Sequence, residues 1–221
     1  MGRAASFWHS TIGKKVVMAV TGIIGIGFLI AHVVGNLMIF RGPVVLNDYS
    51  HFLHGPAGEL LWVVRVVLIV AVILHIIAAW QLTQRSHAAR PVAYARREPQ
   101  ISTIASRAMR WGGVILLVFI VFHILHFTTG TIRPAGTFEE GNVYANVVAS
   151  FRIWWVMLFY VIAMAFLGLH LYHGAWSSVR TLGATGESPD PFHRRASATL
   201  AILVWLGFTL VPLAVFFGLV G

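Results

Sequence analysis

The chain has 221 residues, of which 58% are hydrophobic and 10% charged, and its formal net charge is +9. A soluble domain of this length cannot bury so much apolar surface, so the composition predicts an integral membrane protein. The chain has no cysteine. This excludes disulfides, thiolate-held iron–sulfur clusters, thioether-linked haem and a cysteine nucleophile, and any redox cofactor must therefore be held by histidine.

Five apolar segments are long enough to cross a bilayer. The first covers residues 13–40 and follows basic residues as a signal peptide does, but it is too long and no small-residue cleavage site follows it, so we expect it in the mature protein. The others are residues 58–85, 104–130, 151–180 and 196–220. Each far exceeds the roughly ten residues of a barrel strand and lacks its strict alternation. We predict an all-α membrane protein, a bundle of five transmembrane helices forming one domain over residues 1–221.

The basic residues predict how this bundle is oriented. Twelve of the 16 lysines and arginines would lie on one side of the membrane. They are Arg3, Lys14, Lys15, Arg85, Arg90, Arg96, Arg97, Arg107, Arg110, Arg180, Arg194 and Arg195. The positive-inside rule places this side in the cytoplasm, with the N-terminus there and the C-terminus outside. We expect the chain in the cell inner membrane. Because these charges flank spans and no nucleic-acid motif surrounds them, we expect anionic lipid and a cytoplasmic partner rather than nucleic acid.

The connections between the segments are short and polar. They cover residues 41–56, 86–99, 131–150 and 182–195, with Gly, Pro and charged residues where the helices must stop. None is large enough for a second domain. The most elaborate external loop is predicted over residues 131–150.

Each of the first four segments contains a histidine well inside it: His32, His75, His123 and His170. Ionisable side chains within hydrocarbon are costly and normally face a partner inside the bundle. His32 and His123 lie seven or eight residues from the outer ends of their segments, whereas His75 and His170 lie 16 residues deep. At a rise of 1.5 Å per residue, these depths predict two layers roughly 12 Å apart.

Each layer has the residues that a b-type haem requires. This haem needs no covalent link to protein, and two imidazoles on opposite sides give a six-coordinate iron suited to electron transfer. We predict that His32 and His123 bind one haem near the outer side. We predict that His75 and His170 bind a second haem nearer the cytoplasm, stacked with the first along the membrane normal.

Two further histidines leave a choice of ligand open. His126 follows His123 and His173 follows His170 at a spacing of three, on nearly the same helix face. His126 is shallower than His32, so depth favours His123 as the ligand. The depth of His170, rather than that of His173, matches the depth of His75. His126 and His173 can instead serve haem propionates or a quinone. The other histidines, expected to be solvated or interfacial, are His9, His51, His54, His87 and His193.

Glycines lie close to these histidines, and each has two interpretations. Glycine lets a porphyrin approach the backbone, but small residues also allow close packing of membrane helices. The glycines concerned are Gly22, Gly25, Gly27, Gly112, Gly113, Gly168 and Gly174.

Two charged residues lie at or inside the outer end of the second segment. Arg65 is close to the depth of His32, where a haem propionate would neutralise it, although it can also extend to the outer surface. Glu59, where the external loop enters the segment, can exchange the protons of quinol chemistry. Its alternative role is a solvated acid favoured by the helix dipole.

Several strings, in this order, resemble a known family. They are residues 32–37 (HVVGNL), His75, residues 105–111 (ASRAMRW), residues 122–127 (FHILHF), residues 170–178 (HLYHGAWSS) and residues 181–183 (TLG). Over essentially its whole length, the chain resembles the cytochrome b558-type membrane anchor of succinate:quinone oxidoreductases. This group includes quinol:fumarate reductases with a single five-helix, two-haem subunit.

The resemblance implies a distal haem held by His32 and His123 and a proximal haem held by His75 and His170. It implies a flavoprotein and an iron–sulfur subunit docked on the cytoplasmic face, and quinone, usually menaquinone in the two-haem group, reacting within this subunit. Some members use a glutamate near the outer end of helix two for quinol protons, and Glu59 is the nearest match. We expect no succinate-oxidising site in this chain, so it is part of an enzyme only within its complex. The complex itself can form a higher oligomer.

Basic residues in and beside the cytoplasmic connection of residues 86–99 are expected to dock the iron–sulfur partner and, with His173, to place quinone near the proximal haem. They are Arg96, Arg97, Arg107 and Arg110. Charge at a membrane surface can orient a partner, and anionic lipid is the alternative ligand. Two other functions stay open. One is the cytochrome b subunit of another respiratory dehydrogenase or hydrogenase, and the other is a histidine-rich metal transporter using the H-x-x-H pairs of the third and fourth segments.

Overall fold

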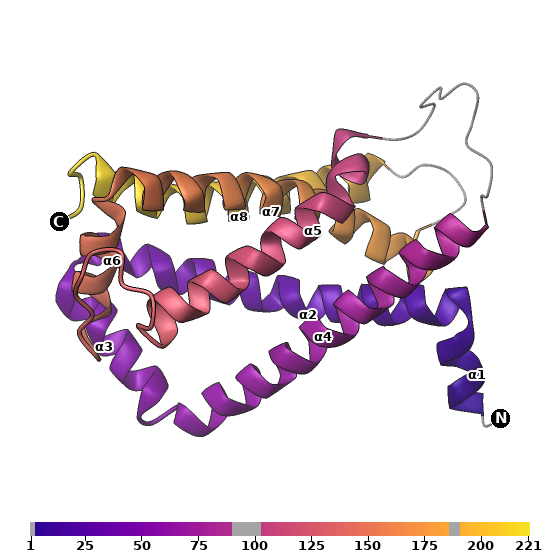
Figure 1. Cartoon of the computed structure of the whole chain (residues 1–221), viewed down its shortest axis with the longest axis horizontal. Coiled ribbons are helices and arrows are strands. Elements are labelled where there is room, and N and C mark those ends of the chain that lie inside the picture. Colours follow the sequence, from indigo (N-terminus) through magenta and orange to yellow (C-terminus); the bar gives the residue numbers. More distant parts are fainter. Residues whose placement is uncertain (1–2, 90–102, 186–190) are drawn as a thin grey trace.

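The structure, a computed structural model, describes residues 3–89, 103–185 and 191–221. The described residues form helices and no strand, and five helices are long and apolar enough to cross a membrane (Figure 1). These are α2 (Thr11–Leu37), α4 (Gly58–Ala88), α5 (Ile104–His123), α7 (Trp154–Thr181) and α8 (Pro191–Phe216). A 3-10 turn, Met38–Arg41, extends α2, and a π-helical turn, Ile124–Thr128, extends α5. The predicted all-α, five-span membrane fold is confirmed.

Side-chain caps begin two of these helices, α2 and α5, where the sequence changes from polar to apolar. Ser10 accepts a hydrogen bond from the backbone N–H of Gly13 at 2.8 Å, and Thr103 accepts one from Ser106 at 3.1 Å. Each cap satisfies a backbone donor that the first helical turn leaves unpaired. The first span therefore begins two residues before the predicted position 13.

Three short helices that the sequence did not predict lie before or between the spans. They are α1 (Arg3–His9), α3 (Pro43–His54) and α6 (Val143–Phe151). Pro43 starts α3 after Gly42, whose φ of 94° is accessible mainly to glycine. Asn47 of α3 donates to the Asn142 side chain at 3.1 Å and accepts from the Tyr144 backbone at 3.0 Å. These long-range bonds join the two external connections, and local sequence patterns do not reveal them.

The boundaries of the fourth and fifth spans differ by a few residues from the approximate ones expected from the sequence. Phe151 belongs to α6, and the fourth span begins at Trp154. The fifth span begins at Pro191, which suits the first turn of a helix because proline has no N–H to donate there, and it ends at Phe216 rather than 220.

The long helices pack as a bundle in which α7 and α8 lie side by side. Helix α2 contacts α4, α7 and α8, and α5 packs on α7. Figure 1 shows α1 and the N-terminus at one end, and α3, α6 and the C-terminus at the other. We call the first the amino-terminal end, where α2, α5 and α8 begin and α4 and α7 finish. The second is the α3–α6 end.

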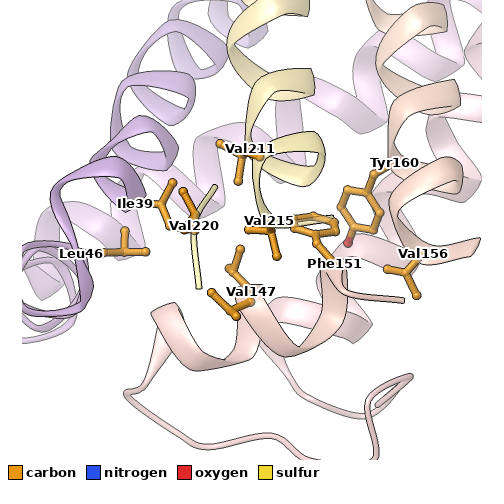
Figure 2. Close-up of a cluster of buried hydrophobic side chains, with 11 residues drawn as sticks. Ile39, Leu46, Val147, Phe151, Val156, Tyr160, Val211, Val215 and Val220 are labelled. Carbon is orange, nitrogen blue, oxygen red and sulfur yellow. The ribbon is translucent and has the colours of Figure 1, made fainter. Parts of the chain in front are cut away.

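The largest buried apolar cluster lies at the α3–α6 end (Figure 2). Its labelled members are Ile39, Leu46, Val147, Phe151, Val156, Tyr160, Val211, Val215 and Val220. Large apolar side chains elsewhere on the spans are exposed, including Ile69 on α4 and Leu203 on α8. Lipid covers such surfaces in a membrane protein. The short helices therefore seal one end of the bundle while the spans present apolar faces to lipid.

Candidate functional site

The four span histidines meet in two pairs. The His32 ring on α2 and the His123 ring on α5 have centroids 5.9 Å apart, with an angle of 82° between the rings. The His75 ring on α4 and the His170 ring on α7 have centroids 6.1 Å apart, with an angle of 51°. The predicted spatial pairing is confirmed, and the role of these residues as haem ligands stays a prediction.

The two pairs occupy different levels of the bundle. Gly22 of α2 lies beside the His75 ring, because a Cβ added to it would be 3.6 Å from His75 Cε1. His32 follows ten residues later on the same helix, which corresponds to about 15 Å along its axis. The His75–His170 pair is therefore nearer the amino-terminal end, and the His32–His123 pair is nearer the α3–α6 end.

The hydrogen bonds of Thr21 favour the tautomer of His75 in which Nδ1 carries the proton. The Thr21 hydroxyl oxygen lies 2.7 Å from the carbonyl oxygen of Val17 and 3.1 Å from His75 Nδ1. A hydroxyl has one proton, and the short contact favours its donation to the Val17 carbonyl, with Thr21 accepting from His75 Nδ1–H. The Nε2 atom of neutral His75 then has a free lone pair, the arrangement that metal-binding histidines use.

His170 has a buried nitrogen without a partner. Its Nδ1 atom is inaccessible to solvent and forms no hydrogen bond with any part of the chain that the structure describes. Nearly all buried polar atoms in proteins have a partner, so an orphan nitrogen is typical of a site rather than of a packed core. It lies within the pair whose other ring is already oriented by Thr21.

Aromatic residues surround the His32–His123 pair. Phe28 stacks on His32 with centroids 5.1 Å apart, and Phe208 of α8 lies 5.6 Å from the same ring. The Tyr160 hydroxyl on α7 is 3.4 Å from His123 Nδ1, which leaves Nε2 of His123 without a hydrogen bond in the described structure. The surroundings are apolar, as a macrocyclic cofactor requires.

His126 is a structural residue in this arrangement. It is 2% exposed, its Nδ1 lies 3.0 Å from the Tyr160 hydroxyl, and its Nε2 lies 2.9 Å from Ser150 Oγ. Both ring nitrogens are therefore satisfied by protein hydroxyls. The contacts join the π-helical turn to α6 and α7 and agree with the preference for His123 as a ligand. In Figure 2, Tyr160 lies beside Phe151 of α6, at the end of the bundle that this network closes.

Thr21 and Tyr160 contact the candidate ligands His75 and His123, and Ser150 contacts His126. The sequence did not predict a role for any of the three. Hydroxyl side chains are common in membrane helices, and none of the three belongs to a motif. The only signal in the sequence is that Thr21 directly precedes Gly22, one of the glycines named above.

The glycines divide between the two interpretations. Cβ atoms added at Gly112 and Gly168 would meet Phe166 at 3.5 Å and Trp205 at 3.4 Å, so these two serve helix packing. Cβ atoms added at Gly25, Gly27, Gly113 and Gly174 would meet no described heavy atom within 4 Å. Gly25 lies between the two histidine levels on α2, and Gly174 lies one turn after His170. Open space beside these two backbones is compatible with a large planar ligand.

Glu59 and Arg65 lie near the start of α4. Glu59 is exposed in the first turn. Arg65 Nη2 donates to Nε2 of the exposed His54 at 3.3 Å, and its guanidinium lies 5.1 Å from the Trp62 ring centroid. The Arg65 side chain thus extends to the corner between α3 and α4. Its role towards a haem propionate and the proton role of Glu59 stay predictions.

The predicted docking residues lie at the amino-terminal end where the structure describes them. Arg107 and Arg110 are exposed near the start of α5, and Arg110 Nη1 donates to His87 Nε2 at 3.0 Å. His173 is half-buried one turn beyond His170. Arg96 and Arg97 lie outside the described residues, as does Arg90.

Among residues 3–89, 103–185 and 191–221, no group of three or more His, Cys, Asp or Glu side chains is gathered for a metal ion. Comparisons with protein families, with curated proteins and with solved structures find no match.

Proposed function

We propose that this chain is a di-haem cytochrome b membrane anchor subunit of a succinate:quinone oxidoreductase. The observation that carries the proposal is the presence of two facing pairs of histidine rings at two levels of a membrane-spanning bundle. A single histidine in a span often has a structural role, but two separate facing pairs match the requirement of two six-coordinate haems.

The spacing of the rings fits this cofactor. One metal held between the two imidazoles of a pair would require ring centroids about 6 Å apart, because each metal–nitrogen bond would be about 2 Å long. The observed separations are 5.9 and 6.1 Å. The differing angles between the rings are compatible with this geometry, because each ring can rotate about its bond to a metal.

The residues around each pair suit binding and electron transfer. A bis-histidine haem b supplies one-electron transfer with no open coordination position for oxygen chemistry. Thr21 contacts His75 through Nδ1 and leaves Nε2 available, and Phe28 and Phe208 pack against the His32 ring. Gly25 and Gly174 leave room beside the backbone.

The assignment to succinate:quinone oxidoreductase, rather than to another respiratory enzyme, rests on the resemblance of the five strings around the histidines. In this proposal the iron–sulfur and flavoprotein partners dock at the amino-terminal end, in the cytoplasm. Arg107, Arg110 and His173 lie at the same end as the His75–His170 pair and are the candidate residues for placing quinone near that pair, with menaquinone as the expected substrate.

A metal carrier built on H-x-x-H pairs is less well supported. Such a pair needs both histidines to offer a nitrogen lone pair, but both nitrogens of His126 are already hydrogen-bonded to Tyr160 and Ser150. The geometry therefore favours His123 as a ligand and His126 as a structural residue.

The purified complex is expected to contain two b haems per copy of this chain. Pyridine haemochrome quantitation measures this ratio, and a reduced-minus-oxidised spectrum should show a Soret band with α and β bands. A ratio near one, or no haem, would reject the di-haem proposal. Identification of the co-purifying subunits separates succinate:quinone oxidoreductase from a formate dehydrogenase or hydrogenase.

Replacing Arg107 and Arg110 together with glutamine should lower the rate of quinone reduction about five- to tenfold. The reason is that charges at the membrane surface orient the iron–sulfur partner relative to this chain. Succinate oxidation with an artificial soluble acceptor should be unchanged, since it bypasses this chain. The double variant Arg41→Gln/Arg152→Gln removes two exposed arginines from the α3–α6 end and is the control. Unchanged quinone turnover with full subunit retention in the first variant would refute this role.

A further inference from the structure

A pocket of about 300 Å³ lies at the amino-terminal end, away from both histidine pairs. It is formed where α1, the first turn of α2 and the last turns of α4 meet. The residues that carry the argument are Trp8, His9, Lys14, Trp80, Gln81 and Arg85. Nothing in the proposed electron-transfer function uses them.

Lys14 is a buried cation in the wall of this pocket. It is 3% exposed, its Nζ donates to the Trp8 carbonyl oxygen at 2.7 Å, and Nζ lies 4.4 Å from the Trp8 ring centroid. An ammonium group has three donors, and the carbonyl satisfies one. A buried charge is costly unless an opposite charge and further hydrogen bonds compensate it. Lys14 therefore favours an anion within the pocket.

Arg85 adds a second positive charge whose acceptors are neutral. Its Nη1 donates to Thr11 Oγ1 at 3.1 Å, and its Nη2 donates to the His9 carbonyl oxygen at 2.7 Å. A guanidinium has five N–H donors, so further donors remain.

No described carboxylate is available to neutralise Lys14 and Arg85. The described acidic residues all lie at the opposite, α3–α6 end of the bundle. They are Asp48, Glu59, Glu139 and Glu140. The two cations therefore share a pocket that contains no acidic side chain in the described structure.

Gln81 and Trp80 also line the pocket, and they indicate what a ligand would contact and at which level of the membrane it would lie. Gln81 has a buried Oε1 atom without a hydrogen-bond partner in the described structure. Its amide can present either its oxygen or its nitrogen to a bound group. Trp80 is 61% exposed and faces the exterior of the bundle. Tryptophan is enriched where the bilayer meets water, so the pocket lies at headgroup level.

We propose that this pocket binds the phosphate group of an anionic phospholipid headgroup. Phosphate oxygens are acceptors that match the unused donors of Lys14 and Arg85, and basic pockets between membrane helices are suited to such headgroups. The lipid joins α1 to the end of α4 from the membrane side. The proposal is independent of whether the histidine pairs bind haem.

The test uses the purified full chain in its complex, stripped of lipid in detergent and titrated with phosphatidylglycerol, phosphatidylcholine or inorganic phosphate. Native mass spectrometry counts the bound lipid. Phosphatidylglycerol should bind at least about tenfold more tightly than phosphatidylcholine, and Lys14→Gln/Arg85→Gln should lose about tenfold in that affinity. Lys15→Gln/Arg180→Gln is the control, because it removes two exposed cations from the same end of the bundle.

Arg85 also holds the α1–α2 corner, so circular dichroism must show that the double variant is folded. A second variant, Gln81→Leu/Trp80→Leu, leaves both cations in place and should weaken phosphatidylglycerol binding about threefold. Equal loss in the control double variant, or unchanged affinity in folded Lys14→Gln/Arg85→Gln, would overturn the proposal. Equal thermal stabilisation by inorganic phosphate at the same concentration would overturn the assignment to lipid.

Discussion

Replacing His75 with alanine should leave one b haem per chain instead of two, and His170→Ala should do the same. Each substitution removes one of two axial imidazoles, and alanine offers no atom that can replace it. The remaining haem should be the one held by His32 and His123, because that pair lies about 15 Å away along α2 and shares no side chain with the lost pair. Pyridine haemochrome quantitation and low-temperature optical spectra measure the loss.

The matched control for His170→Ala is His173→Ala. His173 lies on the same helix one turn later and is half-buried. Both low-spin spectra should persist in this variant. Retention of two haems in His170→Ala, together with loss of one in His173→Ala, would reverse the choice of ligand.

Replacing His126 with leucine should lower the free energy of unfolding by about 2–4 kcal/mol, because removal of one partner leaves buried polar groups unsatisfied. Ser150 Oγ loses the bond at 2.9 Å and the Tyr160 hydroxyl loses the bond at 3.0 Å. Tyr160 keeps its longer contact with His123, so the loss at the Tyr160 hydroxyl should cost less than the loss at Ser150 Oγ. Thermal unfolding of the complex in detergent, followed by circular dichroism, measures the change, and both low-spin haem spectra should remain.

His54→Leu is the control for this stability effect. His54 is exposed, and its ring contacts the Ser50 carbonyl oxygen at 2.9 Å. Surface substitutions of this kind usually change stability by no more than about 0.5 kcal/mol. If His126→Leu and His54→Leu had the same midpoint of unfolding, the buried network would not stabilise the α3–α6 end.

Much of the fold follows from the sequence because the length of an apolar segment is directly related to the thickness of a bilayer. Five such segments predicted five spans, and the structure contains them. The boundaries at Phe151 and Pro191 were harder to predict. Phe151 is apolar, and apolarity alone does not say whether a residue lies in a span or in a short helix packed across its end.

The pairing of the histidines could also be derived from the sequence. An α-helix rises by a constant amount per residue, so counting from a segment end gives depth in the membrane. Depth placed His32 with His123 and His75 with His170, and the ring separations agree. Depth also favoured His123 over His126, for which the structure supplies a physical reason in the two hydroxyls that bind His126.

Only the tertiary structure decided which side chains surround these histidines and where the basic residues meet. Depth gives one coordinate, whereas a contact also depends on how each helix is rotated and which neighbour it packs against. The contact of Thr21 with His75 joins α2 to α4, and Arg85 reaches the backbone of His9 across 76 positions of the chain. The short helices α3 and α6 likewise depend on bonds between distant connections, such as that from Asn47 to Asn142. The sequence alone therefore determined the number of spans and the depth of their histidines, because both depend on distances along one helix. The hydrogen-bond partners and the pocket at Lys14 were decided by packing between helices, which local periodicity does not encode.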